Sequence, residues 1–140
     1  MLSLRPFHAA YPVNDIQKSK YFYNHILGCE IGRFTSTWID FNFFGHQLVF
    51  HQFTEASSVE LVQDLDSKSV PIPHFGVVLN WKDWDSFIER LRSFNVQFEI
   101  EPYTRFANKT CEQKTCFFKD PNGLNLEFKV FKSDSMIFKA

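Results

Sequence analysis

The hydrophobic pattern of the first half of the chain predicts one strand, one helix and then three strands. A short strand over residues 4–13 is followed by Asn14-Asp15, whose side chains suit a helix N-cap, and by an amphipathic run over residues 16–27. Gly28 then supplies the left-handed residue that commonly ends a helix. After it the hydrophobic period changes to two. This change predicts strands over residues 29–34, 37–43 and 47–53, the last two joined by a turn around Gly45.

The same order of elements returns in the second half of the chain. Residues 74–80 have the pattern of a strand, and a helix is expected to begin near Asp83. Its apolar face consists of Trp84, Phe87, Ile88 and Leu91. Three more strands are predicted over residues 96–100, 115–118 and 124–131, with the tight turn "DPNG" before the last. The chain therefore consists of two tandem βαβββ units, and its fold class is α+β with curved mixed sheets.

A polar segment joins the two units. Residues 54–73 end in "VPIP" and show no clear periodicity, apart from a short helical turn that could form near Leu61 to Leu65. We expect a single domain over residues 1–140. Its parts are unit one (1–53), a connector (54–73), unit two (74–131) and a C-terminal tail (132–140).

Composition and charge narrow the range of partners. The net charge is -1, and the chain has no long run of like charge and no basic stripe of the kind typical of nucleic-acid binding. We therefore expect a small-molecule or protein partner and no nucleic acid. Three cysteines without a CxxC pair favour a reducing compartment, hence a cytoplasmic protein. The N-terminus has no apolar signal region, and no apolar run reaches the length of a membrane span, so no membrane association is expected.

Two histidines occupy equivalent positions of the repeat. His8 and His74 are 66 residues apart, as are Val13-Asn14 and Leu79-Asn80, and each histidine opens the first strand of its unit. A lone histidine on an apolar strand is usually a core residue. Two at equivalent positions would meet if the units packed about a pseudo-twofold axis, and convergent ligands of this kind suit a metal.

Glu127 is a third candidate for metal binding. It lies in the last predicted strand between Leu126 and Phe128, and a buried carboxylate needs a cation or several hydrogen bonds. The alternative is that Leu126 and Phe128 face the core while Glu127 faces solvent. Strand parity alone does not decide between the two.

Two stretches resemble a known family. "FHAAYPVNDIQKSKYFYNHILG" is similar to the opening strand and helix of the vicinal oxygen chelate superfamily, and "CFFKDPNGLNLEFKVF" resembles its closing hairpin. The superfamily includes glyoxalase I, extradiol dioxygenases, fosfomycin-resistance enzymes, methylmalonyl-CoA epimerase and bleomycin-resistance proteins. The resemblance implies a central metal cavity whose ligands come from the first and last strands of the units. Here these ligands would be His8, His74 and Glu127.

The resemblance also implies a reaction. "WIDFNFFGHQLVFH" followed by "PHFGVVL" is most similar to small predicted dioxygenases of the extradiol type. Two histidines and one carboxylate form the facial triad of non-heme Fe(II) enzymes, although Mn, Ni or Zn would accept the same ligands. The leading hypothesis is therefore an Fe(II) dioxygenase acting on a vicinal diol or catechol-like molecule. A glyoxalase-type lyase or epimerase/isomerase, and a metal-free small-molecule binding (resistance) protein, are the alternatives.

A possible fourth ligand distinguishes these hypotheses. Alignment of Gly45 with Gly123, an offset of 78, puts Val49 opposite Glu127, and valine cannot bind a metal. His51 lies two residues further on and shares a strand face with Val49. It could be a ligand after a register change, an acid or base acting on the substrate, or a partly exposed strand end.

Other polar residues could contact the substrate. Tyr103 and Arg105 belong to a polar segment, residues 101–115, that could cover the cavity and bind a phenolate or carboxylate, or they are ordinary loop residues. His25 is expected at the surface, and His46 at the surface or in a lid. We also expect a homodimer, because the edges of the two curved sheets need cover.

Overall fold

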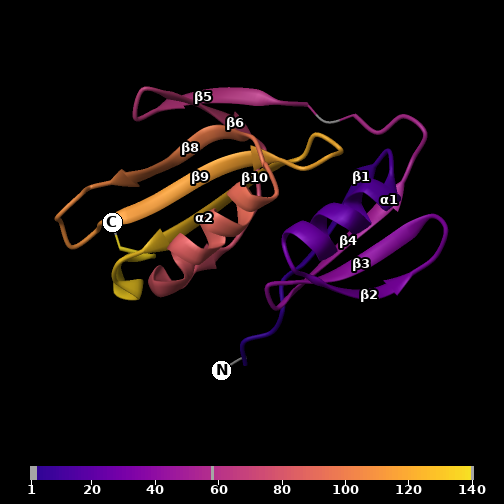
Figure 1. The fold of residues 1–140 in the computed structure, drawn as a ribbon, viewed down its shortest axis with the longest axis horizontal. Coiled ribbons are helices and arrows are strands. Elements are labelled where there is room, and N and C mark those ends of the chain that lie inside the picture. The colour runs from indigo at the N-terminus through magenta and orange to yellow at the C-terminus, as the bar shows by residue number, and fades with distance from the viewer. Residues whose placement is uncertain (1–2, 58, 140) are drawn as a thin grey trace. The chain divides into compact units, whose positions relative to one another are not determined.

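The computed structural model describes residues 3–57 and 59–139 and divides them into two compact units. The first comprises residues 3–57 and 120–122, and the second comprises residues 59–119 and 123–139. Each unit has a four-stranded mixed sheet and a helix, so the predicted α+β fold with two βαβββ units is confirmed (Figure 1). Residues 1–2, 58 and 140, which fall in the predicted first unit, connector and tail, lie outside the described residues.

The first unit follows the predicted pattern closely. Its sheet has the order β1-β4-β3-β2, with β1 parallel to β4 and the other pairs antiparallel. The strands are β1 (His8–Val13), β2 (Glu30–Phe34), β3 (Trp38–Phe43) and β4 (His46–Gln52). Helix α1 (Ile16–Lys20) continues as the π-helical turn η1 (Tyr21–Ile26). Asp15 caps α1 by accepting hydrogen bonds from Gln17 N and Lys18 N, and Gly28 has the expected positive φ of 79°.

The core of the first unit is aromatic. The ring of Tyr23 is fully buried and packs against Phe41 and Phe50, with centroid distances of 5.4 and 4.9 Å. Its hydroxyl donates to Asp120 Oδ2 at 2.9 Å. Asn122 Oδ1 accepts from the backbone N–H of Asp15 at 2.9 Å. The "DPNG" turn therefore satisfies polar groups at the helix and in the core of this unit.

The second unit repeats this arrangement. Its sheet has the order β7-β10-β9-β8, with β7 parallel to β10. The strands are β7 (Val78–Leu79), β8 (Phe98–Arg105), β9 (Gln113–Lys119) and β10 (Asn125–Phe131). The helical segments are η2 (Trp81–Asp83), α2 (Trp84–Ser93) and η3 (Asp134–Met136). Phe87 of α2 packs on Phe128 of β10 at 4.7 Å, and both Leu126 and Phe128 are fully buried.

Equivalent residues of the two units are paired in the two sheets. Ala9 pairs with Leu48 in the first unit, and Phe75 pairs with Leu126 in the second. These pairs differ by 66 and 78 residues, the two offsets used to align the units in the sequence. His8 and His74 are therefore equivalent, and Val49 occupies the position of Glu127.

The predicted helical turn near Leu61 to Leu65 is wrong, because this segment is a strand. β5 (Leu61–Leu65) and β6 (Lys68–Ile72) form an antiparallel hairpin. Its turn residues, Asp66 and Ser67, both have positive φ, 52° and 60°. Two-residue turns of this kind usually have the sequence Asn-Gly or Asp-Gly. Because Asp66-Ser67 contains no glycine, the hairpin was not predicted from the sequence. Val70 of β6 packs against Ile100 and Phe117 of the second sheet.

Two other boundaries differ from the prediction. The expected strand over residues 74–80 is reduced to β7, with one isolated pairing at Phe75. The polar segment 101–115 is not one loop, because residues 101–105 belong to β8. Tyr103 and Arg105 are therefore strand residues paired with Thr115 and Gln113.

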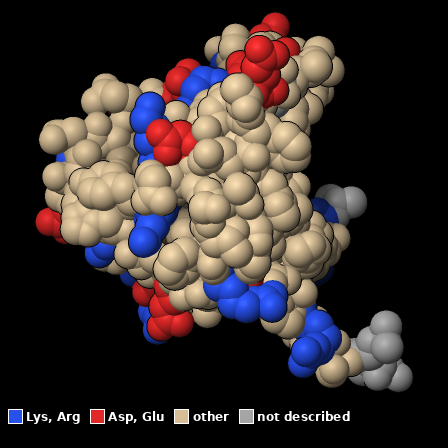
Figure 2. All heavy atoms as spheres, turned by 90° about the vertical axis from the view of Figure 1, so that its right-hand side faces the viewer, with Lys and Arg blue, Asp and Glu red and all other residues tan. Residues whose placement is uncertain are grey.

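The surface agrees with the balanced composition. On the face shown in Figure 2, acidic and basic side chains are interspersed among uncharged residues. Among the described residues, no helix is long and apolar enough to cross a membrane.

Candidate metal-binding residues

His74 and Glu127 contact each other directly in the second unit. His74 lies just before β7 and Glu127 in the middle of β10, and His74 Nε2 is 2.9 Å from Glu127 Oε2. Their side chains are 23% and 13% exposed. This contact answers the question of strand parity. Leu126 and Phe128 lie on the helix side of the sheet, while Glu127 lies on the opposite side, where it is half-buried.

The second ring nitrogen of His74 has its own partner. Nδ1 is 2.7 Å from the carbonyl oxygen of Pro71. Because a carbonyl only accepts hydrogen bonds, Nδ1 carries a proton, and in the neutral ring the lone pair is on Nε2. Nε2 and the carboxylate of Glu127 are then two acceptors that face each other. Two facing acceptors repel each other, so a proton or a metal cation between them is needed to offset this repulsion.

The carboxylate of Glu127 is held at its other oxygen. Thr115 Oγ1 donates to Oε1 at 2.8 Å, and Lys129 Nζ lies 3.2 Å from the same atom. Oε2 is left facing His74. Metal-binding side chains are commonly oriented in this way, by partners on the atom that does not bind the metal.

The two groups shift each other's pKa. The hydrogen bond to Glu127 raises the pKa of His74, against the opposing effect of burial. Burial alone would raise the pKa of Glu127, but the hydrogen bonds from His74 and Thr115 and the charge of Lys129 outweigh it and lower this pKa. In the metal-free protein each group therefore favours the charged form of the other.

Gly76 lets the His74 segment approach β10. A Cβ on residue 76 would overlap the carbonyl oxygen of Glu127 and lie 2.7 Å from its carbonyl carbon. Only glycine fits at this distance. The residue was not identified from the sequence, although a glycine within a strand pattern is a known indication of close backbone approach.

One wall of this site is apolar. The ring of Phe117 lies edge-on to His74 at 5.1 Å, and Val70 and Ile72 of β6 pack in the cluster that contains Phe117. The hairpin β5–β6 thus covers part of the sheet face that carries Glu127. Neither the hairpin nor Thr115 could be assigned to the site from periodicity.

His8 is held through the same ring nitrogen as His74. In the first unit its Nδ1 lies 2.9 Å from Gln47 Oε1, and its side chain is exposed. Nδ1 therefore donates and Nε2 keeps its lone pair.

His51 lies away from His8 within the first unit. Strand pairing places both on one face of the sheet, with His51 opposite Pro12 and His8 opposite Gln47. His51 shares this face with Val49, as predicted. Four residues of strand β4, about 13 Å, separate His51 from Gln47. Its side chain is exposed. His25 is also exposed, as expected, and His46, the first residue of β4, is half-buried.

Tyr103 and Arg105 both contact the hairpin turn. Tyr103 Oη donates to Asp66 Oδ2 at 3.0 Å, and Arg105 forms an ion pair with the same carboxylate. Burial, followed by the contact with Asp66, raises the pKa of Tyr103 to about 12. These contacts fix the turn of β5–β6 on β8.

The His74–Glu127 pair suits two adjacent metal ligands. Ligands at neighbouring corners of an octahedral ion with bonds of about 2.1 Å are about 3.0 Å apart, close to the observed separation. Within either unit, the described His, Cys, Asp and Glu side chains form no group of three that could hold a metal. A complete ligand set therefore needs a further residue, and His8 stays the predicted one.

Comparisons with known proteins support the fold. A family model described as the Glyoxalase/Bleomycin resistance protein/Dioxygenase superfamily matches residues 5–128. A glyoxalase/bleomycin resistance protein/dioxygenase from Alicyclobacillus acidocaldarius is 29% identical, with a TM-score of 0.76 over 95% of this chain and 96% of the other.

Two more distant solved structures share the fold. A glyoxalase/dioxygenase from Nostoc punctiforme is 19% identical, with a TM-score of 0.68 over 92% of each chain. A fosfomycin resistance protein from Listeria monocytogenes is 14% identical, with a TM-score of 0.65 over 98% of this chain and 99% of the other. The comparison with curated proteins gave no match.

Proposed function

Because the chain belongs to the glyoxalase/bleomycin resistance protein/dioxygenase superfamily, we propose that it is an enzyme that binds a divalent metal through His8, His74 and Glu127. The observation that carries this proposal is the contact of His74 Nε2 with Glu127 Oε2. In each side chain the other polar atom already has a partner. Nδ1 of His74 contacts Pro71 O, and Oε1 of Glu127 contacts Thr115 and Lys129.

The number of ligands supports Fe(II). Val49 stands where a fourth ligand would have to come from, and the common strand register of the two sheets supports this alignment. Two histidines and one carboxylate leave coordination positions open, as in non-heme Fe(II) oxygenases. We therefore propose an extradiol-type dioxygenase whose substrate is a vicinal diol or catechol-like molecule. When bound, the metal would polarise the substrate oxygens and lower the pKa of a hydroxyl.

The protein residues have separate proposed tasks. Thr115 and Lys129 keep Glu127 in a fixed orientation, and Phe117 with the hairpin β5–β6 limits access of water to it. His51 is proposed as the base that removes a substrate proton. The contacts of Tyr103 and Arg105 with Asp66 favour a role in holding the hairpin, and a direct contact with substrate would require these bonds to open.

Anaerobic reconstitution tests the reaction. Apoprotein loaded with Fe(II) and mixed with catechol should develop a charge-transfer absorption band, and ring-cleaved product should form when oxygen is admitted. Protein that keeps its iron but neither binds nor cleaves any of a broad set of vicinal diols would contradict the dioxygenase assignment. A lyase or isomerase of the glyoxalase kind would then be the better assignment.

A further inference from the structure

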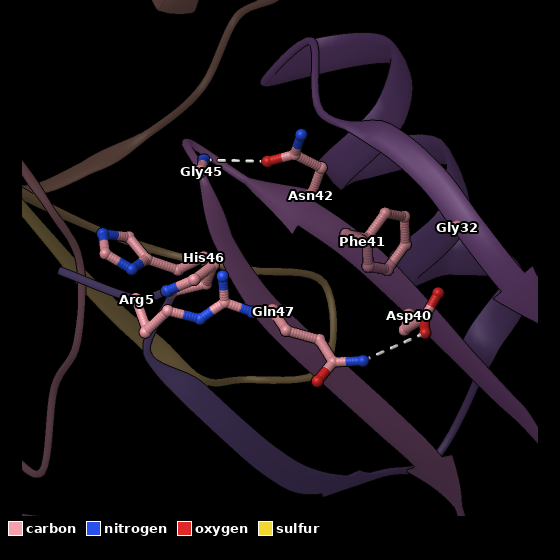
Figure 3. Close-up of a pocket in the computed structure, with 9 residues that line it drawn as sticks. Arg5, Gly32, Asp40, Phe41, Asn42, Gly45, His46 and Gln47 are labelled. Atoms are coloured by element: carbon pink, nitrogen blue, oxygen red, sulfur yellow. Dashed lines mark hydrogen bonds between the residues drawn. The ribbon is translucent and has the colours of Figure 1, made fainter. Parts of the chain in front are cut away.

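A chain of polar side chains crosses one face of the first sheet and ends at His8. It begins at β2, where the backbone N–H of Arg33 donates to Asp40 Oδ1. Gln47 Nε2 donates to Asp40 Oδ2 at 3.4 Å, and Gln47 Oε1 lies 2.9 Å from His8 Nδ1. Figure 3 shows the amide of Gln47 turned toward the carboxylate of Asp40. The four residues come from the four strand positions β2, β3, β4 and β1, in the order of the sheet.

Asp40, the first side chain of this hydrogen-bonded series, is buried and is fixed by a backbone contact from β2. It is only 6% exposed, and β2 shifts its register between Ile31 and Phe34, which frees the N–H of Arg33 for the carboxylate. A Cβ on Gly32 would overlap Asp40 Oδ1 and lie 3.1 Å from its Cγ. Glycine at this position therefore makes room for the carboxylate.

The chemistry of Asp40 sets the direction of every later hydrogen bond. An ionised carboxylate only accepts, so Gln47 must turn its NH2 group toward Asp40 and its carbonyl oxygen toward His8. The carbonyl oxygen also only accepts, so the proton of His8 must be on Nδ1. The lone pair of the neutral ring is then on Nε2.

We propose that Asp40 and Gln47 are positioning residues that fix the Nδ1–H tautomer of His8 and so present its Nε2 lone pair to a metal. The consequence for metal binding rests on the proposed function of His8, whereas the tautomer does not. His74 reaches the same tautomer by an unrelated contact, with Pro71 O. Partners on the remote ring nitrogen typically change metal affinity by about 10–100-fold when they are removed.

His46 provides an internal reference. The backbone N–H of Phe7 donates to His46 Nδ1 at 3.0 Å, which requires a lone pair on Nδ1 and places the proton of the neutral ring on Nε2. His46 and Gln47 line the same pocket of the first unit (Figure 3). Two histidines of one sheet should thus show opposite tautomers.

Nitrogen NMR of the imidazole rings in the metal-free protein tests the proposal. At about pH 8, above the reference histidine pKa of about 6.5, wild-type His8 should carry its proton on Nδ1 and His46 on Nε2. Asp40→Asn places beside Gln47 an amide that can donate as well as accept, so Gln47 can turn its NH2 group toward His8 and the Nδ1–H form of His8 should lose its dominance. Asp40→Asn combined with Gln47→Glu exchanges the two groups, restores the direction of the bonds and should restore the tautomer.

A matched variant and a second readout complete the test. Asp64→Asn makes the same change from a carboxylate to an amide on the exposed strand β5 and should leave His8 unchanged; unchanged His46 signals show that a variant is folded. A proton on Nε2 of wild-type His8, or an unaltered tautomer in Asp40→Asn, would overturn the proposal. Metal affinity should fall about 10-fold or more in Asp40→Asn and recover in the exchanged double variant. If Asp40→Asn changes the tautomer of His8 but not the metal affinity, the positioning role of Asp40 and Gln47 stands and His8 is not a metal ligand.

Discussion

Thr115 Oγ1 donates a 2.8 Å hydrogen bond to Glu127 Oε1, while Oε2 of the same carboxylate faces His74. Thr115 is only 3% exposed, so no water molecule can easily take its place. The bond links β9 to β10 and fixes which oxygen of Glu127 is available. Thr115, which is not itself a proposed ligand, would therefore be important for the proposed metal site.

We expect Thr115→Val to weaken metal binding by about 10-fold or more, because the isosteric side chain removes the donor without opening a cavity. Thr115→Ser keeps the hydroxyl and should stay close to wild type. Competitive titration with a chromophoric chelator measures both. Equal affinities for the Val variant and wild type would show that Thr115 does not orient Glu127.

Gly76→Ala should destabilise the protein by about 3 kcal/mol or more, since the new Cβ meets backbone atoms of Glu127 that cannot move aside. Urea unfolding gives the loss. Gly45→Ala is the control, because its added Cβ has no atom within 4 Å and its loss of stability reflects only the strain of the positive φ of 91°. A Gly76→Ala variant as stable as the control would contradict the close approach.

The His74–Glu127 pair should make the unfolding free energy of the metal-free protein depend on pH. The raised pKa of His74 gives stability that is fully present below the unfolded value of 6.5 and is lost as pH rises through the folded value. The lowered pKa of Glu127 gives stability that is present above 4.5 and is lost as pH falls through the folded value. Both contributions are present between pH 4.5 and 6.5.

Denaturant unfolding of wild type and Glu127→Gln across this range measures the effect. The difference in unfolding free energy should be largest between pH 4.5 and 6.5 and should shrink at more alkaline pH. A difference that stays constant from acid to alkaline pH would mean that the pair does not form in solution. The same raised pKa implies that protons compete with the metal, so metal affinity should fall as pH drops below the folded pKa of His74.

His51→Ala should leave the metal content unchanged and lower turnover by about 100-fold or more, as expected for the loss of a general base. His25→Ala, which changes another exposed histidine, is the control and should keep full turnover. Metal analysis and steady-state kinetics of the same preparations separate the two effects. Metal lost together with His51 would instead identify it as a ligand.

We expect a homodimer in solution. Strand β5 is exposed along its whole length and carries the apolar side chains Leu61, Val62 and Leu65, which are 64, 60 and 45% exposed. An exposed apolar edge strand of this kind is commonly covered by a partner. Light scattering at micromolar concentration should give about twice the chain mass of 16.6 kDa, and a monomer would count against the expectation.

Much of the fold and part of the site could be predicted from the sequence. The offset between His8 and His74 and the alignment of Val49 with Glu127 both recur in the strand pairing, because turn glycines and hydrophobic periods fix the register of each strand. The hairpin β5–β6 could not be predicted, since its Asp66-Ser67 turn lacks glycine.

The contacts that orient the candidate ligands were also beyond prediction. Thr115 meets Glu127 across two strands, and Asp40 meets Gln47 across another two. Neither pair has a sequence pattern of its own, because each depends on which residues the sheet register places side by side. Polar residues that orient a candidate ligand from a neighbouring strand can be identified only when the pairing of the strands is known.

Metal content is the most direct measure of the central claim that His74 and Glu127 bind a metal. Protein purified without a histidine tag, incubated anaerobically with Fe(II), Mn(II), Ni(II) or Zn(II) and desalted, should retain about one metal ion per chain by mass spectrometry. His74→Ala and Glu127→Gln should retain almost none, while His25→Ala should match wild type. A wild-type protein that retains no metal, or a His74→Ala variant that retains as much as wild type, would contradict the account.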